Sequence, residues 1–192
     1  MRTGIVVLAA GASVRLGRPK QLLQVKGEPL VRRVVKAALR SKADSVAVVL
    51  GAYHDAVGSV LADLPVTLAF NGAWLQGMAG SMQTGLAALP PGTEAVLFLT
   101  CDQPAVDARI LNRVLRAAGE DPLARVACAY GDTVGIPALF GKGWFPRFRD
   151  LQGDRGAKAL LQGEGVVEVP WEPGAHDLDT PEDVARWGVA QR

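Results

Sequence analysis

The chain has few cysteines and histidines. Only two of each stand among its 192 residues. Cys101 and Cys128 form no C-x-x-C pair and no cluster with the histidines, so we expect neither a disulfide nor a zinc site. Free thiols are typical of a reducing compartment, and we expect a cytoplasmic protein.

Long hydrophobic runs are also missing. The N-terminal stretch MRTGIVVLAAG is far shorter than the roughly 20 apolar residues that a membrane-spanning helix needs. It leads into a glycine-rich loop instead of a small-residue cleavage site. We therefore expect neither secretion nor a membrane partner.

No excess of charge of one sign marks the sequence. It holds 21 Lys and Arg against 19 Asp and Glu, a net charge of +2, with 49% hydrophobic residues. This balance argues against the broad basic face of a nucleic-acid binder. Since no linker or low-complexity block divides the chain, we predict one domain over residues 1–192.

Short apolar runs alternate with stretches of helical periodicity, which predicts βαβ units and an α/β fold with a mainly parallel sheet. Two runs flank Gly131-Asp132, a hairpin signal that predicts an antiparallel insertion. The predicted strands lie near residues 4–9, 45–50, 66–70, 95–100, 126–130, 136–140 and 166–169. The predicted helices lie near residues 30–42, 54–63, 79–88, 107–118, 155–162 and 181–190.

A glycine-rich loop with three cations follows the first predicted strand. That strand is continuously apolar, as in a central parallel strand, so the loop starts at its carboxyl end, where open α/β sheets bind ligands. Gly11 and Gly17 permit backbone conformations and close approaches that a Cβ hinders. Arg15, Arg18 and Lys20 supply three positive charges within six residues. The loop therefore predicts a polyphosphate site.

The loop does not match two common nucleotide-binding motifs. Gly11 and Gly17 are six apart and no Ser or Thr follows Lys20, so the G-x-x-x-x-G-K-[ST] motif of P-loop ATPases is absent. The loop lacks G-x-G-x-x-G as well, and Asp44 is poorly placed as a ribose-binding acid, which argues against a dinucleotide fold. The alternative is a surface turn with solvated cations.

The fourth predicted strand ends on a carboxylate, in the segment Leu97-Phe-Leu-Thr-Cys-Asp102-Gln-Pro. Asp102 would therefore lie at the same sheet edge as the glycine-rich loop. A carboxylate beside a polyphosphate suits Mg²⁺, which takes one or two carboxylates and completes its shell with waters and phosphate oxygens. The alternative is that Asp102 caps a turn or the helix that begins near Asp107.

Two further acids precede the last predicted helix. In an extended segment Asp177 and Asp179 point to the same side, and either could complete a metal site opposite Asp102, with Asp179 favoured. Thr180 would cap the helix. The alternative is that these acids, with Glu182 and Asp183, serve only the helix start.

Six segments of the chain carry a resemblance to a known family. They are LAAGASVRLGRPK (8–20), NGAWLQGMAGS (71–81), TCDQP (100–104), GIPALF (135–140), GDRGA (153–157) and DLDTPEDV (177–184). Together they resemble the molybdenum cofactor cytidylyltransferase group of the molybdopterin nucleotidyltransferase (MobA-like NTP transferase) family. The resemblance runs in order from Gly4 to about Trp187 and implies a three-layer α/β/α Rossmann-like fold of the glycosyltransferase-A type.

The resemblance implies a chemistry. A phosphate of molybdenum-loaded molybdopterin would attack the α-phosphorus of CTP, forming the CMP ester and releasing pyrophosphate, with Mg²⁺ (or Mn²⁺) as cofactor and no covalent enzyme intermediate. The implied partners are CTP or another NTP, a molybdopterin-type phosphorylated acceptor, and a molybdoenzyme or its chaperone.

The resemblance also implies roles for individual residues. Arg15, Lys20 and Asp102 would be catalytic, and Asp102 and Asp179 would hold the metal. The nucleotide would contact Leu8, Ala9, Ala10, Gly11, Arg15, Lys20, Gly80 and Ser81. The acceptor would face Gly135, Pro137, Gly153, Asp154 and Gly156.

Base choice depends on Ala10. Guanylyl-transferring relatives usually read Leu-Ala-Gly-Gly here, whereas this chain reads Leu-Ala-Ala-Gly, which favours CTP. A methyl group narrows the base pocket, which disfavours binding of a purine by about 1–3 kcal/mol. The chain departs from the family pattern at Leu16 and Lys158, where Met and Arg are common. Three alternatives stay open. The nucleotide could be GTP or another NTP, and the acceptor could be a sugar or polyol phosphate. The protein could also be a non-catalytic carrier of the molybdenum cofactor.

Overall fold

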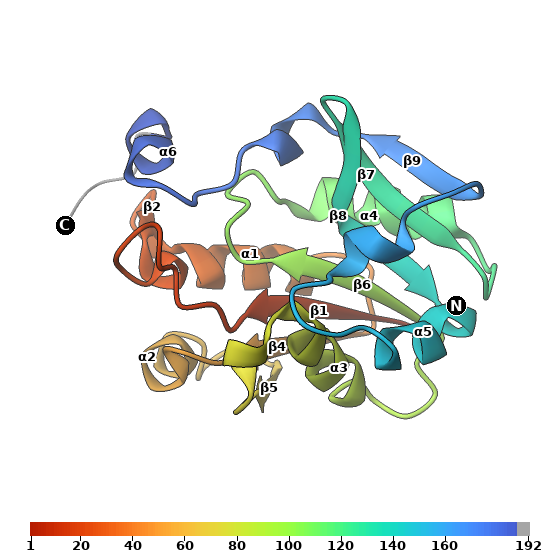
Figure 1. Cartoon of the computed structure of the whole chain (residues 1–192), viewed down its shortest axis with the longest axis horizontal. Helices are drawn as coiled ribbons and strands as arrows, with labels where there is room; N and C mark the ends of the chain where they lie inside the picture. The colour runs from red at the N-terminus through yellow and green to blue at the C-terminus, as the bar shows by residue number, and fades with distance from the viewer. Residues whose placement is uncertain (188–192) are drawn as a thin grey trace.

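A seven-stranded sheet in the order β5-β4-β1-β6-β8-β7-β9 forms the centre of the molecule, in a computed structural model that describes residues 1–187. In Figure 1 the sheet extends from β5, at the bottom of the view, to β9 at the upper right. The strands are β1 (Thr3–Ala9), β4 (Ser45–Leu50), β5 (Thr67–Phe70), β6 (Ala95–Thr100), β7 (Arg125–Tyr130), β8 (Thr133–Gly141) and β9 (Val166–Pro170). All seven strands predicted from the sequence are present.

The sheet is mixed in the way that the hairpin signal predicts. β1, β4, β5 and β6 run parallel, with Val7 of β1 opposite Val48 of β4 and Leu99 of β6. β8 is antiparallel to both β6 and β7, while β9 is parallel to β7. The β7–β8 turn is Gly131-Asp132, and Gly131 takes the left-handed conformation (φ 53°) that such tight turns require.

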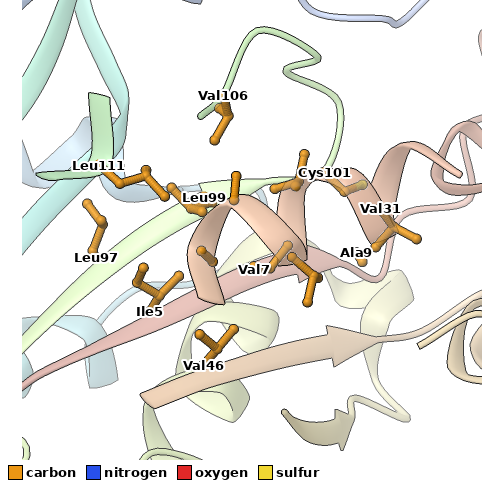
Figure 2. Close-up of a cluster of buried hydrophobic side chains, with 14 of the residues drawn as sticks. Ile5, Val7, Ala9, Val31, Val46, Leu97, Leu99, Cys101, Val106 and Leu111 are labelled. Atoms are coloured by element: carbon orange, nitrogen blue, oxygen red, sulfur yellow. The ribbon is translucent and has the colours of Figure 1, made fainter. Parts of the chain in front are cut away.

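Helices cover both faces of the sheet. Alternate residues of β1 point to opposite faces, so Ile5 and Val7 pack with α1 and α4, whereas Val6 and Leu8 pack with α3 and α5. The predicted three-layer α/β/α fold is therefore confirmed. Figure 2 shows the first of these cores, with Ile5 and Val7 of β1 among the side chains. The α-helices are α1 (Leu30–Leu39), α2 (His54–Ser59), α3 (Met78–Ala87), α4 (Ala108–Ala118), α5 (Phe145–Arg149) and α6 (Pro181–Arg186).

Some predicted helices are shorter than expected. The helix predicted near 155–162 is only a 3-10 turn, Ala157–Leu160, because Gly163 and Gly165 at positive φ follow it. The helices predicted at 30–42 and 54–63 end early, at Leu39 and Ser59. α6 begins at Pro181 as predicted, and residues 188–190 of that prediction lie outside the described residues.

Several small elements were not predicted. A hairpin joins β2 (Gln24–Val25) to β3 (Glu28–Pro29), with Lys26 and Gly27 at positive φ in its turn. Short 3-10 turns are η1 (Lys20–Leu22), η2 (Trp74–Gln76), η3 (Lys142–Trp144), η4 (Ala157–Leu160) and η5 (Glu172–Ala175). Helix α5 was also missed, since its aromatic and proline residues are poor helix formers and it forms by burying Phe148.

The four parallel strands β5, β4, β1 and β6 end at one edge of the sheet. The glycine-rich loop follows β1 there, and Asp102 follows β6. The cis peptide Ile136–Pro137 of β8 lies near this edge as well, because Ala138 pairs with Phe98 of β6. Within residues 1–187, no helix is both long and apolar enough to span a membrane.

Candidate functional site

A cavity of about 340 Å³ opens at this carboxyl edge of the sheet. Its mouth carries Val14 and Leu75, whose exposed fractions of 84% and 81% are unusual for large apolar side chains. Apolar surface beside polar groups suits a ligand with both an aromatic and a charged part. The residues predicted from the sequence that line the cavity are Leu8, Ala10, Gly11, Lys20, Ser81, Asp102 and Asp154.

The loop after β1 turns sharply at two positions. Gly17 has φ 71°, as the glycine prediction expected, and Ser13 has φ 54°. The Ser13 carbonyl accepts from the amides of Leu16 and Gly17, both at 3.1 Å. Gly11 has no positive φ, and a Cβ there would meet no atom within 4 Å. Glycine at this position therefore leaves the cavity wall open.

Gln21 holds the start of this loop in place. Its side chain is fully buried and its Nε2 donates to the carbonyls of Ala9 (3.0 Å) and Gly11 (2.8 Å). The Lys20 amide in turn donates to the Ser13 hydroxyl at 3.1 Å. Gln21 was missed by the sequence prediction, because a buried glutamine cannot be distinguished from a surface one by residue type. Ala9 is itself buried and does not line the cavity.

Lys20 joins two acids from distant parts of the chain. Its Nζ lies 2.5 Å from Oδ2 of Asp102 and 2.8 Å from Oδ1 of Asp179, and its side chain is only 17% exposed. Burial by itself lowers the pKa of Lys20, but the attraction of Asp102 and hydrogen bonds to both carboxylates outweigh burial and raise it above its ordinary value. Lys20 is therefore charged and is not a solvated surface cation.

Arg15 extends the same cluster toward solvent. Its guanidinium donates to Oδ2 of Asp179 at 2.7 Å, with the Arg15 side chain 71% exposed. An ion pair so exposed contributes little stability. Arg15 can therefore release Asp179 and turn to another anion at small cost.

The backbone brings Asp179 to Asp102. The amide of Leu178, a fully buried residue, donates to the Asp102 carbonyl at 2.9 Å. Thr180 caps α6 in a reciprocal capping box with Asp183. Asp183 thus serves the helix start, whereas the side chain of Asp179 turns to Lys20 and Arg15.

The capping alternative for Asp102 does not hold. The N-cap of α4 is Asp107, whose carboxylate accepts from the amides of Arg109 (2.9 Å) and Ile110 (3.0 Å). Asp102 is buried, and its second oxygen, Oδ1, has no hydrogen-bond partner within the described residues. A buried carboxylate oxygen without a partner is costly unless a ligand completes it.

This donor set fits a divalent cation that is shared with a phosphate. Residues 1–187 contain no group of three or more His, Cys, Asp or Glu side chains that could hold a metal alone. Asp102 and Asp179 offer two carboxylates, which matches the preference of Mg²⁺ for few protein ligands and several phosphate or water oxygens. Asp177 differs from these two carboxylates. Although Asp177 is exposed as a whole residue, desolvation of its carboxyl group raises its pKa to about 6, and repulsion from Asp102 and Asp179 adds to this shift.

The first turn of α3 supplies the opposite wall of the cavity. Ser81 is 5% exposed and its Oγ accepts from Nδ2 of Asn71 at 3.0 Å. Gly80 does not line the cavity; a Cβ there would lie 3.5 Å from the same Asn71 nitrogen. Gly80 and Ser81 therefore stand together beside Asn71, but only Ser81 faces the cavity.

The segment 153–156 packs against the N-terminus of α3. The Gly153 carbonyl accepts from the Ala79 amide at 3.0 Å, and a Cβ on Gly77 would lie 2.3 Å from the Gly153 carbonyl carbon. Asp154 reaches the cavity lining, while a Cβ on Gly156 would press on Met78. This segment, expected on the acceptor side, adjoins the wall that carries Ser81.

The other expected acceptor segment lies next to Asp102. Gln103 is 2% exposed and its Nε2 donates to the carbonyls of Ile136 (3.1 Å) and Gly174 (3.2 Å). A Cβ on Gly135 would come 2.2 Å from the Tyr130 hydroxyl, so a larger residue there would displace the Tyr130 side chain. Gly135 and Pro137 are outside the cavity lining, on the β8 side of the site.

Both cysteines are buried thiols and no disulfide links them. Burial raises the pKa of Cys101 and of Cys128 to about 12, and Asp102 adds to the shift at Cys101. They are therefore protonated at neutral pH and behave as small core residues.

Residues 5–169 match the model of the MobA-like NTP transferase domain. The chain belongs to this family. The match spans the glycine-rich loop, Ser81, Asp102 and the 153–156 segment, so most of the cavity lies within the family's shared domain.

Three curated relatives of this family member carry different names. The purine catabolism protein PucB of Bacillus subtilis (strain 168) is 30% identical, over 93% of this chain and 92% of that protein. The nicotine blue oxidoreductase of Paenarthrobacter nicotinovorans is 30% identical, over 94% of each. The molybdenum cofactor guanylyltransferase of Rhodobacter capsulatus is 33% identical, over 97% of this chain and 95% of that protein.

Solved structures share the whole fold. Rv0371c from Mycobacterium tuberculosis H37Rv superposes with a TM-score of 0.84 and 29% identity, over 97% of each chain. The same protein in complex with manganese gives 0.81 and 26%, over 97% of this chain and 98% of that one.

Proposed function

We propose that this nucleotidyltransferase-family protein is a Mg²⁺-dependent molybdenum cofactor cytidylyltransferase. It transfers CMP from CTP to the phosphate of molybdenum-loaded molybdopterin and releases pyrophosphate. The observation that carries the proposal is the cluster in which Lys20 contacts Asp102 and Asp179 beside the cavity.

The charges of this cluster suit a triphosphate and its metal. Asp102 and Asp179 would hold the cation, which when bound offsets charge on the phosphates. Lys20 and Arg15 then have phosphate oxygens as alternative partners, Lys20 as a point charge and Arg15 through its two-pronged guanidinium. The partnerless Oδ1 of Asp102 supports a ligand at this point.

The reaction needs positioning more than covalent help from the protein. An acceptor phosphate oxygen forms a bond to the α-phosphorus while the bond from that phosphorus to the bridging oxygen of the β-phosphate breaks, and pyrophosphate takes the electron pair. Lys20 and Arg15 would stabilise the charge that develops on the leaving group. The segments at Gly135 and Pro137 and at Gly153, Asp154 and Gly156 would receive the acceptor.

CTP is proposed on the basis of Ala10, which lines the cavity next to Gly11. GTP is the second candidate, because a relative 33% identical to this chain is named a guanylyltransferase. The manganese complex of the 26% identical structural relative supports a divalent cation. We also propose a cytoplasmic location.

The test is pyrophosphate release with Mg²⁺ and molybdenum-loaded molybdopterin, offering CTP, GTP, ATP and UTP separately. Release with CTP is expected, and Asp102→Ala should reduce it by at least about 100-fold, the scale for losing a group that stabilises transferred charge. Asp55→Ala is the matched control, because Asp55 is exposed on α2 and should leave the rate unchanged.

Other outcomes redirect the assignment. Release with GTP alone would replace the cytidylyl assignment by guanylyl transfer. Release only with a sugar or polyol phosphate would replace the acceptor. Binding of molybdopterin without turnover of any of the four nucleotides would favour a carrier of the molybdenum cofactor.

A further inference from the structure

Asn71 is held at four points at the carboxyl edge of the sheet. It follows β5 directly, and its backbone N–H donates to the Leu50 carbonyl at 2.9 Å while its carbonyl accepts from the Trp74 amide at 3.3 Å. Its Oδ1 accepts from the Ala73 amide and its Nδ2 donates to Ser81 Oγ, both at 3.0 Å. Asn71 is 6% exposed, so this arrangement is shielded from water.

These contacts fix which end of the Asn71 amide faces Ser81. The Ala73 amide can only donate, so the group opposite it must be the oxygen, and the NH₂ group is left to face Ser81. A hydroxyl that accepts this bond keeps its own hydrogen for another partner. Within residues 1–187, the Ser81 hydroxyl donates to no acceptor, and Ser81 lines the cavity.

We propose that Asn71 is a positioning residue that makes Ser81 a hydrogen-bond donor to the nucleoside part of the nucleotide. The class of group recognised is an acceptor, such as a base carbonyl or unprotonated ring nitrogen, or a ribose oxygen. This inference rests on the proposed function, because it needs a nucleotide in the cavity. Recognition of the nucleoside at this wall then depends on the direction of the Ser81 hydroxyl hydrogen.

The direct test is Asn71→Asp, which keeps the shape and reverses the polarity. A carboxylate still accepts from the Ala73 amide but now also accepts from the Ser81 hydroxyl, which turns that hydrogen away from the cavity. We expect CTP affinity, measured by calorimetry, to fall about tenfold, the scale of one lost hydrogen bond to an uncharged group. Asn112→Asp, on α4, adds the same charge elsewhere and should leave affinity unchanged.

Two further measurements separate hydrogen direction from charge and from misfolding. Inorganic tripolyphosphate lacks a nucleoside, so the wild type and Asn71→Asp should bind it equally. In a Ser81→Ala background, Asn71→Asp should cause no further loss of CTP affinity. If Asn71→Asp does not fold, Asn71→Ala is measured instead. We expect it to lose less CTP affinity than Asn71→Asp, and to cause no further loss in a Ser81→Ala background.

The outcomes are distinct. Unchanged CTP affinity in Asn71→Asp, an equal loss for tripolyphosphate, or a loss that persists in the Ser81→Ala background would each overturn the inference while leaving the proposed function intact. A wild-type protein that binds tripolyphosphate but no nucleoside triphosphate would overturn the proposed function itself.

Discussion

The Lys20 ammonium lies between the two carboxylates that are proposed to hold the metal. With Arg15 it provides two cations for Asp102 and Asp179, so the cluster is balanced in charge without any bound ion. Under the proposed function, each carboxylate would exchange a protein cation for a metal cation on metal binding. Lys20 and Arg15 would then be free for the phosphates, which would link metal binding to nucleotide binding.

The substitution Lys20→Met keeps the length of the side chain and removes its charge. Without nucleotide, Mn²⁺ should bind this variant about tenfold more tightly than the wild type, because the competing ammonium is gone. Tripolyphosphate should bind more weakly, since a phosphate partner has been lost. Electron paramagnetic resonance of free Mn²⁺ measures the first effect and calorimetry the second.

Lys42→Met is the matched control, because the structure gives the Lys42 side chain no ion pair within residues 1–187. It should leave both affinities unchanged. Weaker Mn²⁺ binding in Lys20→Met would contradict the exchange, since Lys20 would then be supporting the metal site instead of competing for it.

Residue type and strand ends predicted part of this site. Lys20 and Asp102 each follow the end of an apolar strand, and parallel strands bring their carboxyl ends together, so their proximity followed from the sequence pattern. Gln21 and Asn71 gave no such signal. Their roles depend on which backbone groups lie opposite them after folding, and side-chain amides are common in surface loops.

At the scale of elements, α3 connects the sheet to the cavity wall. A Cβ on Gly85 would lie 2.3 Å from Cγ1 of Val6 and 2.9 Å from Cγ2 of Val49, so the helix rests directly on β1 and β4. The same helix carries Ser81 in its first turn. The distance of α3 from the sheet therefore sets the width of the site.

Gly85→Ala should push α3 away from β1 and lower the free energy of unfolding by about 1–3 kcal/mol, the usual cost of overpacking. CTP affinity should fall with it. Gly58→Ala is the matched control: its Cβ would meet Leu50 at an ordinary 3.6 Å, and alanine favours the helix by up to about 1 kcal/mol. Urea unfolding measures both. Equal stability of the two variants would contradict the close packing of α3.

The strands were more predictable than the helices. Each strand is an apolar run bounded by polar or turn residues, and that pattern holds whatever the strand packs against. The helices near 30–42 and 54–63 continue as patterns beyond Leu39 and Ser59, where the structure ends them. α5 forms because Phe148 is buried under the sheet, which is a tertiary effect that local propensity does not reveal.

Across the whole molecule, the fold gathers residues from both ends of the chain. Arg15 and Asp179 are 164 positions apart, and the hydrogen bond from Leu178 to Asp102 closes that distance. The sequence indicated that two acids precede the last helix, and in the structure the Asp179 carboxylate contacts Lys20 and Arg15. The family resemblance predicted the order of the matching segments along the chain. Which side chains contact one another was seen only in the structure.

The most direct test of the central claim is to follow the α-phosphate of CTP. With Mg²⁺ and molybdenum-loaded molybdopterin, CTP labelled at the α-phosphorus should give a labelled molybdopterin product and unlabelled pyrophosphate, and Asp102→Asn should abolish the transfer. Label that never reaches the acceptor, or an acceptor labelled by CTP that carries its label at the γ-phosphorus, would contradict nucleotidyl transfer at this site.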